Sequence, residues 1–203
     1  MEYKWLKKEG NNSLIVFFNG WGMDEGIIKH LELKEQDLLM FYDYNNLNLK
    51  LDISELNKYN EIHLIAWSMG VMIATLFDID YDTKTAINGT LKPIDDNYGI
   101  PERIYNLTVK NFSPKGRDVF IRNMFNGENI HITNQREFNN QKSELESLMQ
   151  YKSNLDFKYD KILISDNDKI IPTKNQINFW ETGANIKGGH APFVLFNSWS
   201  ELL

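Results

Sequence analysis

The sequence predicts a single α/β domain in which a mostly parallel sheet carries helices on both faces. Two observations support this class. Short runs rich in β-branched and aromatic residues alternate three times with helix-compatible segments, which is the pattern of parallel strands joined by crossover helices. The chain of 203 residues is also long enough to bury one sizeable core and too short for two full-sized domains. We therefore expect one domain over residues 1–203.

Five segments are predicted as strands because they are nearly continuous in apolar residues, as expected for strands buried on both faces. They cover residues 13–18, 37–44, 61–67, 83–88 and 161–165. The segments compatible with helices are 24–31, 52–59, 69–77, 173–180 and 193–203. Asp24 is the expected N-cap of the first, and Asp52 or Ser54 that of the second.

The alternation of strands and helices stops near residue 89. A turn-rich loop with two of the five prolines follows, and after it come three helix-like stretches near 101–111, 115–126 and 134–152. We expect residues 89–155 to form a helical lid insertion over one edge of the sheet. The aromatic residues of 101–125, such as Tyr105, Phe112, Phe120 and Phe125, are interpreted as the core of the lid rather than as a ligand site.

Composition narrows the classes of function. The formal net charge of −6 argues against a nucleic-acid binder, because phosphate recognition needs a basic surface. The chain contains no cysteine, so a disulfide framework, a thiolate metal site and a cysteine nucleophile are excluded. It shows no signal-peptide pattern and no 18-residue apolar span. We expect a cytoplasmic monomer without membrane contact, metal or organic cofactor.

Ser68 lies at the point where an apolar strand-like run changes to an apolar helix-like run, in the stretch AWSMG. Ala66 and Gly70 are small enough to allow a sharp strand-to-helix turn. Such a turn holds the serine hydroxyl above the C-terminal edge of the sheet, at the N-terminus of a helix. This stretch alone leaves two interpretations open, a nucleophile or a serine that caps the helix.

A serine nucleophile needs a base and a carboxylate, and an α/β-hydrolase has them in the order Ser, Asp, His. His190 is the candidate base because the paired glycines of KGGHAPF let this loop approach the sheet edge. The other histidines lie in polar sequence or inside a strand: His30, His131 and His63. Asp166 and Asp168 both follow the last strand directly. Asp168 is the favoured acid and Asp166 the alternative.

An acyl-transfer site also needs N–H donors for the oxyanion. The N–H of Met69 is one candidate because it follows Ser68 directly. The N–H of Trp21 is the other, since Gly20 and Gly22 in FFNGWGMD let this loop turn inward after an early strand. The alternative for the loop is a plain turn with a buried aromatic residue.

The motifs FFNGWGMD, AWSMGV, INGT…PIDD…GIP and GGHAPF resemble those of the BioG family of pimeloyl-[acyl-carrier protein] methyl ester esterases, over essentially the whole chain. The resemblance implies an α/β-hydrolase that removes the methyl ester of pimeloyl-[acyl-carrier protein] in biotin biosynthesis. It implies these site residues: Ser68 as nucleophile, His190 as base, Asp168 as acid, and the N–H groups of Trp21 and Met69 as oxyanion hole. Asn19 and Ala66 depart from the broader fold, where histidine and glycine are common.

Basic residues gather in the predicted lid. Residues 103–122 contain five basic side chains and one acidic side chain, a local net charge of +4. The five are Arg103, Lys110, Lys115, Arg117 and Arg122. On a lid they would steer an acidic acyl-carrier protein toward the site, although charge runs of this kind are often only solvated helix faces. The alternative functions are a broad short-chain carboxylesterase or thioesterase, which would need no basic lid, and a non-catalytic binding module.

Overall fold

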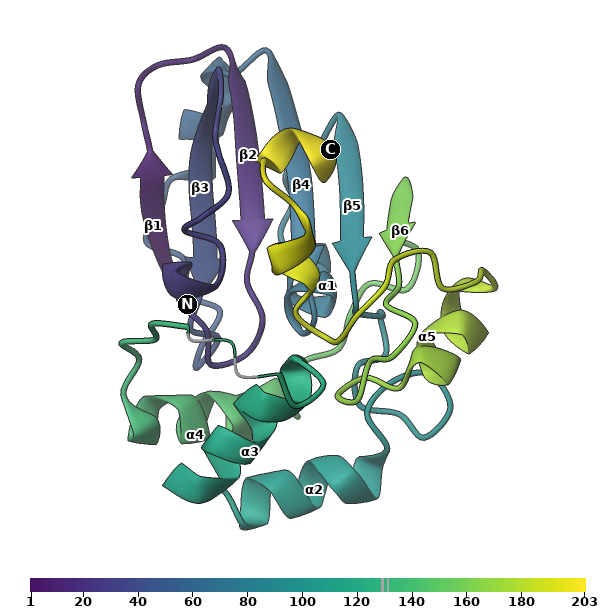
Figure 1. Ribbon diagram of the computed structural model, residues 1–203. Helices are drawn as coiled ribbons and strands as arrows, with labels where there is room; N and C mark the ends of the chain where they lie inside the picture. Colours follow the sequence, from purple (N-terminus) through teal and green to yellow (C-terminus); the bar gives the residue numbers. More distant parts are fainter. Residues whose placement is uncertain (129, 131) are drawn as a thin grey trace.

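A six-stranded sheet forms the centre of the computed structural model, which describes residues 1–128, 130 and 132–203 (Figure 1). His131 therefore lies outside the described residues. The strand order is β1-β3-β2-β4-β5-β6. The strands are β1 (Glu2–Lys7), β2 (Ser13–Phe18), β3 (Gln36–Tyr42), β4 (Glu61–Trp67), β5 (Thr83–Ile87) and β6 (Lys161–Leu163). All neighbouring strands are parallel except β1, which runs antiparallel to β3.

The five predicted strands are present as β2 to β6; β2 and β4 have the predicted bounds, and the ends of the other three differ by at most two residues. Strand β1 was not among the predictions. Its sequence EYKWLK alternates charged and apolar residues, and its side chains are only partly buried. This is the pattern of an edge strand with one exposed face, and it is much weaker than a continuous apolar run.

The helices are α1 (Gly70–Ile73), α2 (Glu102–Lys110), α3 (Pro114–Met124), α4 (Phe138–Leu148) and α5 (Thr173–Trp180). Several segments predicted as helices form only short 3₁₀ turns, at Glu25–Ile27, Ile53–Lys58, Ala74–Leu76, Pro192–Leu195 and Trp199–Glu201. Asp24 and Asp52 cap the first two by accepting the N–H two residues ahead, a local bond that favours a tight turn. In the C-terminal segment Ser198 starts a new capping box with Glu201, which interrupts any continuous helix.

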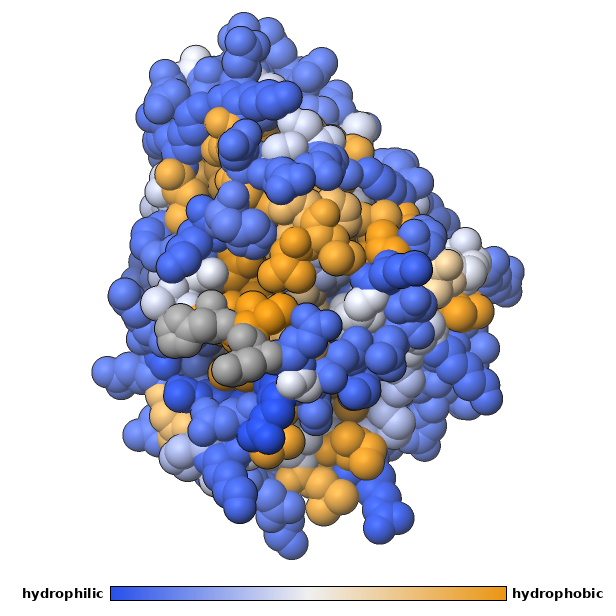
Figure 2. All heavy atoms as spheres, in the orientation of Figure 1, coloured by the Kyte–Doolittle hydropathy of each residue, from blue (hydrophilic) through white to orange (hydrophobic). Residues whose placement is uncertain are grey.

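Both faces of the sheet are covered by apolar side chains. Along β2, Leu14 and Val16 belong to one core cluster, whereas Ile15 and Phe17 belong to the other. The first cluster includes residues of α1, α2 and α4, and the second includes the C-terminal turns. Figure 2 views the face of the molecule that carries the C-terminal turns and shows apolar side chains gathered at its centre.

The helices α2, α3 and α4 follow β5 in the chain and lie beyond the C-terminal ends of the parallel strands, at the bottom of Figure 1. We call residues 89–155 the helical insertion. Its helices and the sheet edge enclose the region to which the sequence assigns chemistry. Among the described helices, none has the length and apolarity needed to cross a membrane.

Candidate active site

Ser68 occupies a strained turn between β4 and α1. Its φ is 58°, a left-handed conformation that is uncommon for a residue with a side chain and typical of a nucleophile elbow. A Cβ atom at Gly70 would lie 2.3 Å from the carbonyl oxygen of Phe18, and one at Gly89 would lie 2.5 Å from that of Ser68. The turn therefore needs glycine at both positions. Helix α1 has no side-chain cap, so the interpretation of Ser68 as a capping serine is wrong.

Hydrogen bonds connect the three side chains that the sequence singled out. The Ser68 Oγ atom lies 2.8 Å from Nε2 of His190, and Nδ1 of His190 lies 2.8 Å from Oδ2 of Asp168. All three residues are at most 6% exposed. Asp166 is exposed, and its carboxylate accepts the N–H of Gly188 at 3.0 Å. Of the two candidate carboxylates, Asp168 is therefore the one beside the histidine.

The carboxylate of Asp168 is held on both oxygens. Its Oδ1 accepts the N–H groups of Ile170 and Ile171 at 2.8 and 3.1 Å. Its Oδ2 accepts Nε2 of Gln176 at 2.8 Å, in addition to the histidine. Gln176 is fully buried and was not predicted, because only the position of α5 against the β6 loop brings it to the acid.

The backbone of His190 is fixed by residues at the ends of β4 and β5. Its carbonyl oxygen accepts Nε1 of Trp67 at 2.8 Å and Nδ2 of Asn88 at 3.0 Å. Asn88 also accepts the N–H of Ser165 at 2.8 Å, so one amide joins three loops at the sheet edge. Trp67, directly before the serine, thus supports the histidine, and the sequence did not reveal this contact.

The backbone N–H groups of Trp21 and Met69 are the two predicted oxyanion donors. Trp21 and Met69 line the same pocket as Ser68. Within the described part of the chain, neither of their backbone N–H groups donates to a protein acceptor. The Trp21 indole is used elsewhere, because its Nε1 donates to the carbonyl oxygen of Gln141 at 2.8 Å. The role of the Trp21 N–H as an oxyanion donor stays a prediction, and so does the alternative of a plain turn with a buried aromatic residue.

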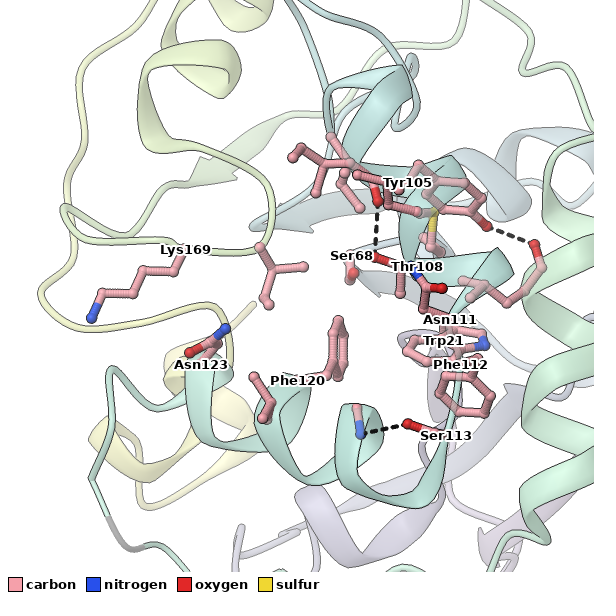
Figure 3. A pocket seen from close by; sticks show the side chains of 18 of the residues that line it. Trp21, Ser68, Tyr105, Thr108, Asn111, Phe112, Ser113, Phe120, Asn123 and Lys169 are labelled. Carbon is pink, nitrogen blue, oxygen red and sulfur yellow. Dashed lines mark hydrogen bonds between the residues drawn. The ribbon is translucent and has the colours of Figure 1, made fainter.

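A pocket of about 510 Å³ opens beside Ser68 between α2 and α3 (Figure 3). Its apolar lining is Trp21, Met69, Ile100, Ile104, Tyr105, Leu107, Phe112, Val119, Phe120, Leu145 and Ile170. Ile104, Leu107 and Val119 are about half exposed, and apolar atoms appear over α2 and α3 at the bottom of Figure 2. The pocket therefore continues to the surface along an apolar rim. Such a channel suits an extended acyl chain.

The predicted basic residues lie on the two helices that flank the pocket. Arg103 and Lys110 are on α2, and Lys115, Arg117 and Arg122 are on α3. All are exposed except Arg117, which is half-buried. Lys115 also lines the pocket, as does Lys169 from the loop after β6, whose ammonium group points away from the serine in Figure 3.

Comparison with known proteins identifies the family. A family model described as pimeloyl-ACP methyl esterase BioG matches residues 1–202. The chain belongs to the BioG family. The crystal structure of selenomethionine BioG from Haemophilus influenzae is 33% identical to this chain, with a TM-score of 0.89 and coverage of 100% of this chain and 99% of that one. The fold is thus that of an α/β-hydrolase, as expected.

Three further proteins are similar to this chain in sequence or in fold. An uncharacterized protein of Haemophilus influenzae is 35% identical over 216 residues, covering 100% of this chain and 99% of that protein. A malonyl-[acyl-carrier protein] O-methyltransferase of Bacteroides fragilis is 36% identical over 192 residues; the match covers 89% of this chain and 38% of that protein. A lipase-esterase related protein of Clostridium acetobutylicum shares the fold, with a TM-score of 0.62, 13% identity and coverage of 96% and 93% of the two chains. Family and fold together support an esterase.

Proposed function

We propose that this protein is a serine esterase that hydrolyses the methyl ester of pimeloyl-[acyl-carrier protein] to the free acid and methanol. The observation that carries the proposal is the pair of 2.8 Å hydrogen bonds from Ser68 to His190 and from His190 to Asp168. This chain of bonds lies at an apolar pocket lined by Trp21 and Met69, whose backbone N–H groups have no acceptor among the described residues, in a member of the BioG family.

The geometry supports a two-step acyl transfer. Ser68 Oγ attacks the ester carbonyl carbon while His190 Nε2 takes its proton, and the resulting oxyanion accepts the N–H groups of Trp21 and Met69. The tetrahedral intermediate collapses and expels methanol, which receives that proton from the histidine. Water then attacks the acyl carbonyl carbon while His190 takes a proton from the water. The bond from the acyl carbon to Ser68 Oγ breaks, the serine receives that proton from His190, and the acid leaves and ionises to the carboxylate. Asp168 keeps the proton on Nδ1 and stabilises the imidazolium.

The pocket favours an ester over a free acid. Each buried methylene of the acyl chain contributes about 0.8 kcal/mol to binding in an apolar channel. An ionised carboxylate without a partner is strongly disfavoured in such surroundings. Lys115 and Lys169 also line the pocket, but the Lys169 ammonium group points away from Ser68 in Figure 3. The neutral methyl ester therefore suits the apolar surroundings of Ser68 better than the free carboxylate does.

The surface around the pocket suits an acidic carrier protein. Exposed basic side chains stand on α2 and α3, at both sides of the apolar rim. They would steer the carrier protein to this face, and its prosthetic arm would carry the acyl chain along the rim into the pocket. Rates on the carrier-linked substrate should then fall as salt increases, because exposed charges are screened.

The experiment compares wild-type protein with Ser68→Ala on pimeloyl-carrier protein methyl ester, at low and high salt. We expect demethylation by the wild type that weakens with salt and disappears in the variant. Cleavage of free short-chain esters without action on the carrier-linked ester would indicate a broad carboxylesterase or thioesterase. Failure to cleave any ester, together with no labelling by a fluorophosphonate probe, would indicate a non-catalytic module.

A further inference from the structure

Glu144 is a buried carboxylate on α4 that takes no part in the reaction described above. Its side chain is 0% exposed. Its Oε2 accepts the N–H of Gly22 at 3.1 Å, and its Oε1 accepts the N–H of Tyr44 at 3.0 Å. The guanidinium of Arg136 lies 2.7 Å from Oε2. Burial raises the pKa of the Glu144 carboxyl, whereas Arg136 and the two N–H groups oppose this effect by favouring the ionised form.

These contacts reach the loop that carries the proposed oxyanion donor. Gly22 directly follows Trp21, and its φ of 69° is a conformation that suits glycine. Its N–H binds Glu144, and its carbonyl oxygen accepts Nδ2 of Asn134 at 2.8 Å and Nε2 of Gln141 at 3.1 Å. The Trp21 indole donates to the backbone of Gln141. The helical insertion therefore holds both polar backbone groups of Gly22 and the indole.

The other end of the loop is tied to the same carboxylate through Tyr44. The Tyr44 hydroxyl donates to the carbonyl oxygen of Asn19 at 2.7 Å, and the Tyr44 N–H binds Glu144. The side chain of Asn19 in turn accepts the N–H of Gly20 at 2.8 Å. Glu144 thus joins the loops that follow β2 and β3, and the proposed oxyanion donor lies between its points of attachment.

We propose that Glu144 is a positioning residue that sets the direction of the Trp21 N–H through Gly22. This inference rests on the proposed esterase function. Helix α4 also holds a pocket wall, because the hydroxyl of Tyr105 on α2 donates to the carbonyl oxygen of Leu145 at 2.7 Å. The acyl pocket and the oxyanion hole therefore share one support, and the placement of α4 couples them.

The variant Glu144→Gln tests this role with little change in volume. Arg136 and the Gly22 N–H converge on Oε2, so the amide oxygen takes that position and the NH₂ group faces the Tyr44 N–H. The change therefore removes the charge that holds Gly22 and releases the end of the loop that is tied through Tyr44 to Asn19. Loss of an oxyanion donor lowers kcat by about 10²- to 10³-fold, and a misdirected donor should lower it by about ten-fold or more. KM should change little, since the oxyanion exists only in the transition state.

A second measurement, the affinity for a trifluoromethyl ketone inhibitor, separates a positioning role of Glu144 from a merely structural one, because a purely structural role would leave this affinity unchanged. The ketone forms a tetrahedral adduct with the serine, and its oxyanion needs the same donors. We expect its affinity to fall in parallel with kcat in Glu144→Gln, measured on a small methyl ester. Asp37→Asn is the matched control because Asp37 is also fully buried and accepts the N–H groups of Glu9 and Gly10 at 2.9 and 3.1 Å. It lies at the opposite end of β3, so its variant should lose stability but keep kcat and ketone affinity.

The possible failures can be told apart. A folded Glu144→Gln protein with wild-type kcat and ketone affinity would overturn the positioning role. Wild-type protein that cleaves no ester would instead overturn the proposed function. If Glu144→Gln does not fold, Gln141→Met replaces it, because this change removes the side-chain bonds to the carbonyl oxygens of Gly22 and, at 3.4 Å, Arg136, and leaves Glu144 in place. A smaller fall of kcat in the same direction is then expected, and an unchanged kcat would contradict the inference.

Discussion

Replacing Asp168 by asparagine should inactivate the enzyme by reversing the tautomer of His190. The N–H groups of Ile170 and Ile171 converge on Oδ1 of Asp168, so the amide oxygen of the asparagine must take that position. Its NH₂ group then replaces Oδ2, 2.8 Å from Nδ1 of His190. A donor there makes Nδ1 an acceptor and moves the ring proton to Nε2. The histidine can then no longer take the proton of the serine.

Asp168→Asn should have two measurable effects, one on kcat and one on the free energy of unfolding. Loss of the correct tautomer should lower kcat by about 10³- to 10⁴-fold, or roughly 4–5.5 kcal/mol of transition-state stabilisation, since the same substitution in a serine protease lowers kcat by about 10⁴-fold. The new NH₂ group also faces the buried donor of Gln176, whose bond to Oδ2 is 2.8 Å. This clash of donors should lower the free energy of unfolding by about 1–3 kcal/mol.

The assay is hydrolysis of a short-chain p-nitrophenyl ester and of the carrier-linked methyl ester, with urea unfolding of the same preparations. Asp166→Asn is the matched control, since Asp166 is exposed and binds only a loop N–H; it should keep near wild-type activity. The reasoning is refuted if Asp168→Asn retains activity within about ten-fold of wild type, or if Asp166→Asn is the inactive variant.

Two further predictions concern charge at other places in the fold. Burial alone would raise the pKa of Asp37, but hydrogen bonds from Glu9, Tyr59 and other donors lower this pKa from 3.8 to about 2. The ionised carboxylate of Asp37 therefore stabilises the fold above about pH 4, and this stabilisation is lost as the pH falls toward 2. Asp37→Asn should lose roughly 2 kcal/mol of stability at pH 7 and less at pH 3, and equal losses by urea unfolding at both pH values would contradict this. Lys110→Glu should raise KM for the carrier-linked ester but not for a small methyl ester. Lys34 is also exposed but lies at the opposite edge of the sheet, so Lys34→Glu should change neither KM. Equal effects of the two variants on the carrier-linked ester would exclude docking at α2.

The sheet could be predicted from the sequence because its inner strands are buried on both faces. Strands such as β2, SLIVFF, show apolar runs that no exposed segment would carry. The edge strand β1 has no such run. The lengths of the helical segments could not be predicted from the sequence either, because helix propensity and capping residues do not distinguish one turn of 3₁₀ helix from a longer α-helix.

The core of the site was predictable because each of its residues stands in a local motif at the end of a strand. Ser68, His190 and Asp168 are such residues, and glycines or a proline mark their turns. Gln176 and Glu144 carry no such mark. Glu144 lies in the polar stretch FNNQKSELESL, which suggests a solvated helix, and its partner Gly22 is 122 residues away. Contacts of this kind depend on tertiary packing.

The covalent intermediate tests the central claim most directly. If Ser68 attacks the distal methyl ester, the acyl group in the acyl-enzyme is still attached to the carrier protein. Rapid acid quench during turnover, followed by denaturing gel electrophoresis and mass spectrometry, should therefore show a covalent conjugate of enzyme and carrier protein that is absent in Ser68→Ala. An enzyme that instead carries the acyl chain alone, with free carrier protein beside it, would show attack on the thioester and would contradict the proposed reaction.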